Sequence, residues 1–547
     1  MNYYNNEDPN GEKKMSKKFY ITTPIYYPSA APHLGHCYCT TMADILARNK
    51  RMRGFDTYFL TGLDEHGEKI EKNAKAKGVT PQQFVDEVAV TFTDLWKAMQ
   101  ISNDDFIRTT QERHYLKVQK IFSQLLEQGD IYLSSYNGWY CVHEETYYTE
   151  TQLDENHCCP ECHRPVEKKD EEAYFFKAGK YSDFLLDLYD KNPKFIYPVS
   201  KKNEMVNNFI KPGLQDLCVS RTSFDWGIQV VEDPKHVIYV WLDALTNYIT
   251  ALGYMDSDCY LFDKFWRDEE CEIVHLIGAD ITRFHTIYWP EFLHCLGLRE
   301  PNRVFVHGLL MMKDGKMSKS RGNTISAYPL IDQYGVDSVR YYLASEIPFG
   351  SDGVFTPEDF IHRINLDLSN NLGNLVNRTI SMIFKYFNGV LPGFNDKLDE
   401  SDKELVNLRR GTISKYEYLF DDLKVTEAVA EVMNLCSAAN KYIENKAPWT
   451  LFKEGRIEEL SNVMTNLANS IFVAGMLLSP ILVNKSKDIF KSLGLDEKVN
   501  YELIKDEEYL REKNVIKLDA LFPRLDENKE KEFIANIMNT PKEKAAA

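Results

Sequence analysis

Short apolar runs alternate with longer amphipathic stretches over the first 115 residues of the chain. Phe19–Thr23 and Thr57–Gly62 are apolar, β-branched runs of the length typical of buried strands. Residues 38–52, 68–77 and 81–99 instead place their apolar positions at helical spacing. Alternating strands and helices favour an α/β fold built on a parallel sheet.

The same alternation returns between residues 236 and 320. Val237–Trp241, Ile273–Ile277 and Val304–Gly308 have the composition of three further strands. The intervening stretch 116–235 does not continue the pattern. We therefore predict that it is an insertion between two halves of one sheet.

From residue 358 onward the periodicity is helical, with short breaks such as Leu391–Gly393. This pattern predicts an antiparallel helix bundle that extends to about residue 525. The longest apolar run, Ile471–Val483, is interrupted by a glycine and a proline and is too short to span a bilayer. It is expected to be a core helix and its end.

Composition narrows the class of protein. A chain of 547 residues with 44% apolar residues has room for three or four domains of ~150 residues each. Its net charge of −17 argues against a protein that coats nucleic acid and against a DNA partner, but it allows a local RNA-contact face. Eleven scattered cysteines and a polar, signal-free N-terminus indicate a cytoplasmic protein without a membrane segment. Met15 is an alternative start position.

Two histidines follow the first predicted strand, in His33-Leu34-Gly35-His36. Ligands bind in the crevice at the carboxyl ends of parallel strands, and helix N-termini attract phosphates. The histidines are three residues apart, so one helical turn aims both imidazoles the same way. Gly35 allows a nucleotide to approach the backbone closely. The segment predicts a nucleotide-phosphate site.

Two carboxylates and a lysine-rich loop extend the candidate chemistry. Asp64 follows the second predicted strand and is either a helix cap or a partner for an ammonium group. Asp280, which comes after Gly278 at the end of a later strand, suits a ribose hydroxyl. Lys316–Ser320, with the sequence KMSKS, is either an ordinary solvated loop or a mobile cationic loop suited to a triphosphate.

In this order, HLGH and KMSKS resemble the two signatures of class I aminoacyl-tRNA synthetases. Other segments narrow the resemblance to the methionyl enzymes of bacterial type, and it covers roughly residues 19 to 525. These segments are PIYYP before HLGH, GLDEHG at 62–67, YVWLDAL at 239–245, GADITRFH at 278–285, NNLGNLVNR at 370–378 and APW at 447–449.

The resemblance implies a Rossmann-like parallel-sheet catalytic domain with an inserted connective-peptide domain, followed by an all-α helix-bundle anticodon-binding domain. The expected segments are a disordered leader at 1–18, the first catalytic half at 19–115, the connective-peptide insertion at 116–235, the second catalytic half with the KMSKS loop at 236–320, a stem-contact-type segment at 321–357, the anticodon-binding domain at 358–525 and a frayed tail at 526–547.

The resemblance also implies the reaction. ATP, which carries Mg²⁺, would activate L-methionine to methionyl-adenylate before transfer to tRNA. The catalytic residues would be His33, His36, Lys316 and Lys319. The ATP-binding residues would be His33, Gly35, His36, Arg221, Gly278, Asp280 and Lys319. The methionine-binding residues would be Ile25, Tyr27, Asp64, Trp241, Ala244, Leu245, Tyr248, Ile281 and His285. Without the resemblance, the aromatic stripe Trp241–Tyr248 would be interpreted as plain core.

For tRNA, the resemblance implies that Asn374, Arg378 and Trp449 read the CAU anticodon of tRNA(Met), including initiator tRNA. Without it, the first two would be surface polar residues and Trp449 a core residue. We find no separate editing domain in the insertion and no dimerising C-terminal barrel. We therefore expect homocysteine to be rejected in the synthetic site and the chain to be a monomer.

Two other function classes share parts of this sequence pattern. A small-molecule nucleotidylyltransferase is disfavoured by the helix bundle, and a non-catalytic tRNA-binding relative is disfavoured by the intact motifs.

A cysteine pair in the insertion raises the question of a structural Zn²⁺. Cys159 and Cys162 have the CxxC spacing of a zinc knuckle. Methionyl enzymes with a knuckle carry another CxxC near 141–144, but here Glu144 takes the place of its second cysteine. The alternative is a decayed knuckle held by loop packing. The candidate ligands are Cys141, His143, Cys159 and Cys162, with His157, Cys158 or His163 as substitutes for the fourth.

Overall fold

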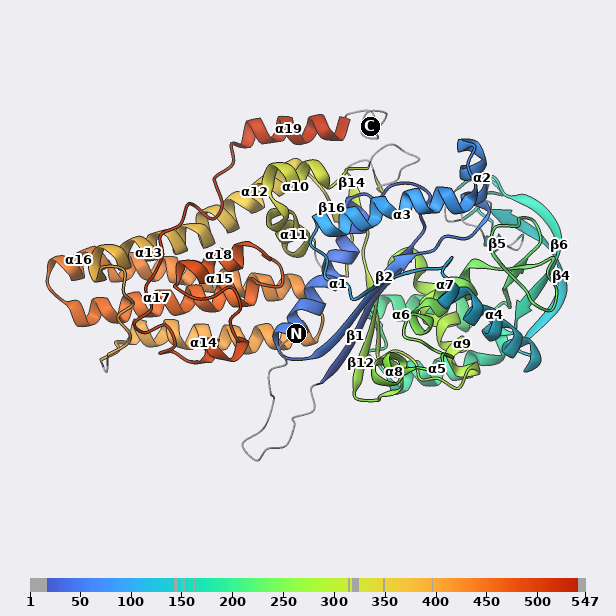
Figure 1. Cartoon of the computed structure of the whole chain (residues 1–547), viewed down its shortest axis with the longest axis horizontal. Coiled ribbons are helices and arrows are strands. Elements are labelled where there is room, and N and C mark those ends of the chain that lie inside the picture. The colour runs from blue at the N-terminus through green and yellow to red at the C-terminus, as the bar shows by residue number, and fades with distance from the viewer. Residues whose placement is uncertain are drawn as a thin grey trace. The chain divides into compact units, whose positions relative to one another are not determined.

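The computed structural model describes residues 17–141, 146–148, 150, 153–160, 163–312, 315–316, 324–347, 350–395 and 397–539 (Figure 1). The chain folds into two compact units. The first unit comprises the chain up to Pro32, Thr57–Asp94 and Asn103–Val306. The second unit comprises His33–Asp56, Leu95–Ser102 and the chain from His307.

A six-stranded sheet organises the first unit. Its order is β3-β2-β1-β12-β13-β7. The strands are β1 (Lys18–Tyr26), β2 (Asp56–Leu63), β3 (Asp105–Arg108), β7 (Ile196–Tyr197), β12 (Cys271–Gly278) and β13 (Arg303–His307). The pairs β1–β12, β2–β3 and β13–β7 are parallel. Phe19, Tyr20 and Ile21 of β1 are fully buried, as expected for a parallel sheet covered on both faces. The predicted Rossmann-like sheet is confirmed.

Helices cover this sheet and enclose an aromatic core that includes Trp266 and Trp289. They are α2 (Glu68–Lys77), α3 (Pro81–Ala98), α4 (Glu112–Glu127), α5 (Ser182–Lys191), α6 (Val199–Met205), α7 (Val240–Thr250), α8 (Tyr260–Phe262) and α9 (Trp289–Cys295). The predicted helices 68–77 and 81–99 agree with α2 and α3 within one residue. No helix in the described part of the chain has both the length and the apolar character needed to cross a membrane.

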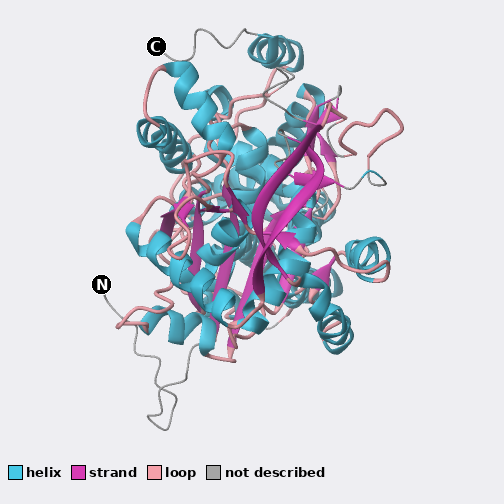
Figure 2. Ribbon diagram, turned by 90° about the vertical axis from the view of Figure 1, so that its right-hand side faces the viewer, coloured by secondary structure: helices cyan, strands magenta, loops and turns pink. Residues whose placement is uncertain are grey.

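The predicted insertion contributes strands to two antiparallel sheets. The larger has the order β5-β4-β6-β8, and its long strands are strongly twisted (Figure 2). Its strands are β4 (Ile131–Cys141), β5 (Thr146–Tyr148), β6 (Glu167–Phe176) and β8 (Leu217–Cys218). A smaller sheet contains β9 (Ser220–Arg221), β10 (Ile228–Gln229) and β11 (Val237–Ile238).

Three strand predictions differ from the structure. The expected core strand at 237–241 is only the two-residue β11, which pairs with β9 and β10 outside the main sheet. Conversely, β7 comes from inside the stretch 116–235 and completes the main sheet. A two-residue strand has too few positions to show a pattern. β1 also continues through Pro24 to Tyr26, past the end of its ladder with β12 at Thr22, so the missing proline N–H breaks no bond with β12.

The second unit is mainly helical. Its helices are α1 (Leu34–Met52), α10 (Tyr328–Tyr334), α11 (Val336–Ser345), α12 (Pro357–Arg363), α13 (Asn374–Phe387), α14 (Glu400–Asp421), α15 (Val425–Lys446), α16 (Pro448–Lys453), α17 (Ile457–Leu478), α18 (Lys485–Ser492) and α19 (Glu527–Asn539). A small sheet contains β14 (Leu310–Met312), β15 (Gly315–Lys316) and β16 (Gly353–Val354). The predicted core helix within 471–483 is the buried end of α17.

The expected frayed tail is wrong for Glu527–Asn539, which form α19. Ile534 is fully buried, and Glu530 accepts hydrogen bonds from Gln333 and from the Tyr334 hydroxyl. These contacts hold a charged segment that local composition alone indicated to be loose.

A buried ion pair fixes α1 inside the second unit. Asp44 Oδ2 lies 2.6 Å from Arg340 Nη2, and both side chains are fully buried. Arg340 also donates to the backbone oxygens of Met99, Pro480 and Ile481. Burial alone would raise the pKa of Asp44, but the facing arginines hold it below its ordinary value. The pair therefore joins α1 to α11 and to the segment between α17 and α18.

Arg340→Met should lower the free energy of unfolding by about 3–5 kcal/mol at pH 7, because it leaves the Asp44 charge buried without its main partner. The pKa of Asp44 then rises, so the deficit should shrink at pH 5, where part of the carboxylate is protonated. Urea denaturation at both pH values measures this. Arg456→Met, which breaks an exposed pair with Glu459, is the control and should cost less than about 1 kcal/mol. Equal deficits at the two pH values would contradict the assignment.

Candidate active site and tRNA-binding residues

The HLGH segment caps helix α1. His33 is the N-cap residue, and its Nδ1 accepts the Gly35 N–H at 3.1 Å. In return, His36 Nδ1 accepts the His33 N–H at 3.1 Å, which completes a capping box. The helix thus begins at Leu34, four residues earlier than predicted. Histidines are not the usual capping residues, so the sequence pattern did not reveal this arrangement.

The cap fixes which ring nitrogens can donate. Since both Nδ1 atoms accept backbone N–H groups, the neutral imidazoles carry their protons on Nε2. The ring centroids lie 4.0 Å apart, at the positive end of a 19-residue helix without acidic residues in its first turn. Two Nε2–H donors at a helix N-terminus are suited to the oxygens of a phosphate.

The KMSKS segment lies only partly within the described residues. Gly315–Lys316 forms β15, and Lys316 pairs with Met311 of β14. Lys319 lies outside the described residues. The structure therefore places the start of the motif on a β-hairpin in the second unit.

The predicted methionine-binding residues gather in the first unit around α7. Leu245 and Tyr248 belong to the main core, and Ile25, Trp241 and Ile281 pack against it. The Trp241 ring is stacked on Phe284, with centroids 3.4 Å apart and an interplanar angle of 5°. Phe284 was not among the predicted residues, although it lies inside the GADITRFH motif.

The two remaining apolar residues of the predicted methionine site are Ala244 and Tyr27. Ala244 is buried on α7. Tyr27 follows the end of β1, and Lys69 Nζ lies 6.0 Å from its ring centroid.

The aromatic side chains Trp241, Tyr248 and His285 are called the aromatic wall below. Its polar group, the hydrogen-bonded pair of His285 and Tyr248, is uncharged. His285 Nδ1 donates to Ile281 O at 3.0 Å, so its Nε2 accepts the Tyr248 hydroxyl at 2.7 Å. Burial lowers the pKa of His285 to about 4. His275, stacked on Tyr248 with a centroid distance of 4.2 Å, has a pKa well below its ordinary value for the same reason. The wall therefore suits a neutral side chain and disfavours a charged one.

Asp64 lies on a loop that is bonded to both β1 and α7, the elements that carry Ile25, Trp241 and Tyr248. It is buried at the end of β2, and its N–H donates to Tyr26 O at 3.0 Å, next to Ile25. Two residues later, His66 Nδ1 lies 2.6 Å from Asp243 Oδ2 on α7. The loop that carries Asp64 is thus tied to β1 on one side and to α7 on the other, the two elements that carry several of the predicted methionine-binding residues.

Asp243 is the centre of a buried network that sequence reasoning missed. Its other oxygen lies 2.7 Å from His114 Nε2, and His114 Nδ1 lies 2.7 Å from Thr250 Oγ1. Burial opposes ionisation, yet His66 and His114 lower the pKa of Asp243. His114 and His66 lie 129 and 177 positions before Asp243, so no local sequence pattern could connect them.

The three other predicted ATP-binding residues within the described part of the chain lie in two different places. Gly278 ends β12 and Asp280 follows in a short 3₁₀ turn, at the carboxyl edge of the sheet as predicted. Arg221 is fully buried in β9, with its guanidinium 4.2 Å from the Tyr140 ring centroid and 4.8 Å from that of Tyr239.

The predicted zinc ligands are only partly described. Cys141 and Cys159 are both buried and pack into one small cluster with Tyr148. Cys162 and His143 lie outside the described residues. The structure thus brings together the two predicted ligands that it describes.

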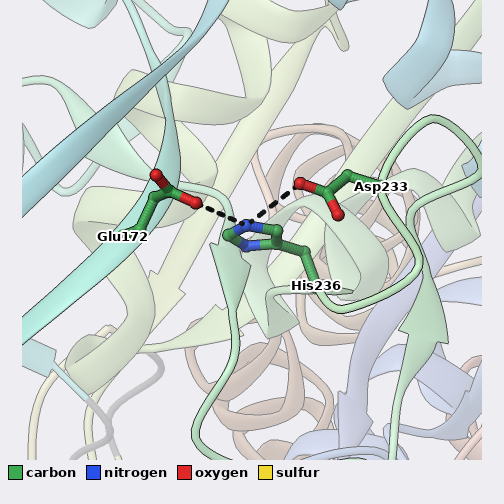
Figure 3. A group of neighbouring side chains, drawn as sticks. All are labelled: Glu172, Asp233 and His236. Carbon is green, nitrogen blue, oxygen red and sulfur yellow. Dashed lines mark ion pairs between the residues drawn. The ribbon is translucent and has the colours of Figure 1, made fainter.

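A different group of side chains is the one candidate for a shared cation among the described residues (Figure 3). His236 Nε2 lies 3.6 Å from Asp233 Oδ2 and 3.9 Å from Glu172 Oε1. However, Lys235 Nζ is 2.6 Å from Glu172 Oε1 and 3.5 Å from Asp233 Oδ2. An ammonium group already neutralises both carboxylates, so we interpret this group as a clamp between β6 and the turn before β11.

The three predicted anticodon residues lie in the second unit. Arg378 Nη2 pairs with Glu444 Oε1 of α15 at 2.6 Å. Asn374 Nδ2 donates to Asn440 Oδ1 at 3.3 Å. Trp449 is 46% exposed, which does not fit a core residue. Asn374 and Arg378 share one face of α13.

Comparisons with known proteins place the chain in a family. Its residues 19–172 and 163–380 match the family described as "tRNA synthetases class I (M)", and residues 394–539 match the "Anticodon binding domain of methionyl tRNA ligase". Methionine--tRNA ligase of Halalkalibacterium halodurans is 50% identical over 542 residues, which cover 97% of this chain and 82% of that protein. Methionine--tRNA ligase of Listeria monocytogenes is 53% identical over 489 residues, which cover 88% of this chain and 73% of that protein.

A solved structure agrees with these matches. Mycobacterium tuberculosis methionyl-tRNA synthetase in complex with methionyl-adenylate superposes with a TM-score of 0.87 at 38% identity, and the match covers 93% of this chain and 100% of that chain. The parallel sheet and the histidine-capped helix are therefore those of a class I aminoacyl-tRNA synthetase. Within that class, the chain belongs to the methionine--tRNA ligase family, as the motifs indicated.

Asp243→Asn should loosen the loop that carries Asp64, because an amide oxygen can accept from only one of the two imidazoles. We expect a loss of about 1.5–3 kcal/mol in stability, the range for a hydrogen bond to a charged group, and faster amide exchange over residues 62–67. Hydrogen–deuterium exchange measures this directly. Asp256→Asn, at a half-exposed carboxylate that pairs with Lys117, is the matched control. Unchanged exchange at 62–67 in the Asp243 variant would show that the network does not hold the loop.

Proposed function

We propose that the chain activates L-methionine with ATP and transfers the methionyl group to tRNA(Met), including initiator tRNA. The observation that carries this proposal is the neutral set of Trp241, Tyr248 and His285 in the first unit, together with the buried Asp64 on a loop that is tied to α7. A neutral pocket with one carboxylate matches an α-amino acid that has an ammonium group and an apolar side chain. The family membership supplies the reaction class.

In the proposed first step, the methionine carboxylate attacks the α-phosphorus of ATP in line and pyrophosphate leaves. No covalent protein nucleophile is needed, so the chain contributes positioning and charge stabilisation. The Nε2–H groups of His33 and His36 would donate to phosphate oxygens, with Gly35 allowing close approach. Lys319, with Lys316 behind it, would neutralise the leaving pyrophosphate. Mg²⁺ would arrive with ATP as part of the substrate.

The nucleoside would be held by other groups. Asp280 would accept from a ribose hydroxyl, with Gly278 allowing close backbone approach. Arg221 would reach a phosphate only after its cover of Tyr140 and Tyr239 opens, because it is fully buried in this structure.

Selection of methionine would rest on the apolar slot. Sulfur gains from contact with aromatic rings, and the uncharged His285–Tyr248 pair gives one polar contact without attracting an ion. The residues proposed to line the slot are Ile25, Tyr27, Trp241, Ala244, Leu245, Tyr248, Ile281 and His285. An apolar slot separates near-isosteres by only ~1–3 kcal/mol. Homocysteine should therefore be activated at a measurable rate.

In the second step, the terminal ribose hydroxyl of the tRNA attacks the adenylate carbonyl. We propose that Asn374, Arg378 and Trp449 read the anticodon. Unstacked bases can be stacked on an indole and hydrogen-bonded along their edges by amide and guanidinium groups. The exposure of Trp449 supports this role, and Glu444 would orient the Arg378 guanidinium.

The chain is further proposed to be cytoplasmic and to hold a structural Zn²⁺. None of the described cysteines forms a disulfide, as expected in a reducing compartment. The shared cluster of Cys141 and Cys159 supports a knuckle completed by Cys162 and His143.

The HLGH proposal can be tested without loss of the helix cap. Asn at position 33 and Gln at position 36 retain the capping box through their amide oxygens but remove both imidazole rings. Their amide N–H groups are bonded to the same carbon as the capping oxygen, so they do not take the positions of the ring Nε2–H groups. The double variant His33→Asn/His36→Gln should keep its thermal midpoint and lose methionine-dependent ATP–pyrophosphate exchange by about a hundredfold or more. The paired His→Ala variant is the reference that also loses the cap. Near-normal exchange in the folded Asn/Gln variant would refute the phosphate role.

The metal proposal predicts about one zinc ion per purified chain. Cys159→Ser and Cys162→Ser should each abolish it, whereas Cys218→Ser, at a buried cysteine elsewhere in the insertion, should not. Elemental analysis of the four proteins is the measurement. Zinc-free wild-type protein, or zinc retained in both knuckle variants, would refute the knuckle.

The anticodon proposal predicts that two activities separate. Trp449→Ala should cut tRNA charging about tenfold or more, since stacking one base is worth ~1–3 kcal/mol, while methionine activation stays unchanged. Arg378→Ala should do the same and relax the preference for CAU. Glu444→Gln removes the charge but keeps an oxygen that can accept from the Arg378 guanidinium and orient it, so this variant should charge nearly normally. If both activities fall together in the first two variants, those residues support the fold instead.

A further inference from the structure

A second exposed aromatic ring lies one helical turn after Trp449. Phe452 is 42% exposed, and the i, i+3 spacing puts it on the same side of α16 as Trp449. Its ring is stacked on Tyr386 of α13, with centroids 4.6 Å apart and an interplanar angle of 28°. Pro448 and Leu451 form the buried side of the same helix. The rings of Trp449 and Phe452 thus face outward although the helix has an inward apolar face.

The backbone at the start of α16 supports a built surface. Ala447 adopts φ +43° and ψ 64°, in the left-handed region that L side chains rarely occupy. Pro448 follows directly and fixes the first turn of the helix. Such strain persists where surrounding structure determines the conformation, and it concentrates at functional sites. Here it sets the direction of a six-residue helix that presents two aromatic rings.

The two helices that carry the rings suit a polyanion, although Glu454 caps the end of α16 and Glu444 of α15 pairs with Arg378. Neither α13 nor α16 contains an acidic residue, although the whole chain has a net charge of −17. Lys385 Nζ lies 5.4 Å from the Tyr386 ring centroid, and Lys453 ends α16. Arg378 and Tyr386 are eight positions apart and share one face of α13. The face proposed to read the anticodon therefore continues to the stacked Tyr386–Phe452 pair.

We propose that Phe452, supported from below by Tyr386, is a second stacking platform for one unpaired base of the tRNA anticodon loop, next to the base taken by Trp449. The inference rests on the proposed anticodon role of Trp449. Every base has a π-face, so this platform adds affinity without reading base identity. The lysines beside it contact the loop phosphates.

The direct test is binding of a tRNA(Met) anticodon stem-loop to wild-type protein and to single variants. Phe452→Leu keeps an apolar side chain over Tyr386 but removes the aromatic face, so the Kd should rise between about fivefold and about a hundredfold. Phe452→Tyr should bind like wild type. Methionine-dependent pyrophosphate exchange and the thermal midpoint should not change in either variant.

A matched control uses Tyr418, which is 66% exposed near the end of α14. α14 leads into the start of α15, whereas α16 follows its end, and the 22 residues of α15 span about 33 Å. Tyr418→Leu should therefore leave stem-loop binding unchanged.

Stem-loops with a single abasic nucleotide identify the stacked base. For wild type, two loop positions should each show a loss when abasic. Phe452→Leu should remove the loss at one position, and Trp449→Leu should remove it at the other. If both variants lose affinity only for the stem-loop that is abasic at one and the same position, Phe452 and Trp449 do not stack different bases, and the separate platform is overturned.

The outcomes separate this inference from the proposed function. If Trp449→Leu weakens binding and Phe452→Leu does not, the platform is wrong and the anticodon proposal stands. If neither variant weakens binding, both are wrong. If wild type sediments as a dimer that Phe452→Leu dissociates, with stem-loop affinity unchanged, the surface is an interface between two copies of the chain and the platform is overturned.

Discussion

The second unit depends on one buried ion pair, Asp44–Arg340, and on the hydrogen bonds that saturate it. Removing two charges from water is costly, and their attraction repays this only where the remaining donors and acceptors are also satisfied. Here Asp44 accepts from Arg48, Ser102 and Arg340, and Arg340 donates to three backbone oxygens. This saturation lets a charged pair hold the HLGH helix α1 firmly against helical elements that follow hundreds of residues later.

The pair explains why α1 belongs to the helical unit although it follows the first strand of the sheet. Other bonds along the same helix add to it. Asn49 donates to the Tyr416 hydroxyl, and Lys50 and Arg53 pair with Asp421. The proposed phosphate-binding histidines and the proposed anticodon residues are therefore parts of one compact unit. The proposed amino-acid slot belongs to the other unit, where burial keeps its histidines neutral.

The sequence patterns predicted the elements that are long and periodic, and they predicted motif positions at strand ends. β1, β12 and α2 lie where the hydrophobic patterns indicated, and Asp64 and Asp280 lie at strand ends. Two-residue strands such as β7 were beyond reach because pairing, not composition, creates them. The Asp243 network joins partners more than a hundred residues apart, and α19 is held by distant contacts. The histidine cap was missed because capping rules are built on residues with side-chain oxygens.

We propose that this chain couples methionine to ATP in a pocket that admits a neutral thioether and holds its ammonium group at Asp64. ATP–pyrophosphate exchange by the wild-type protein, run separately with each of the twenty amino acids and without tRNA, tests it most directly. The account predicts rapid exchange with methionine and at most traces with the other nineteen. Rapid exchange with a different amino acid, or none with any of them, would contradict it.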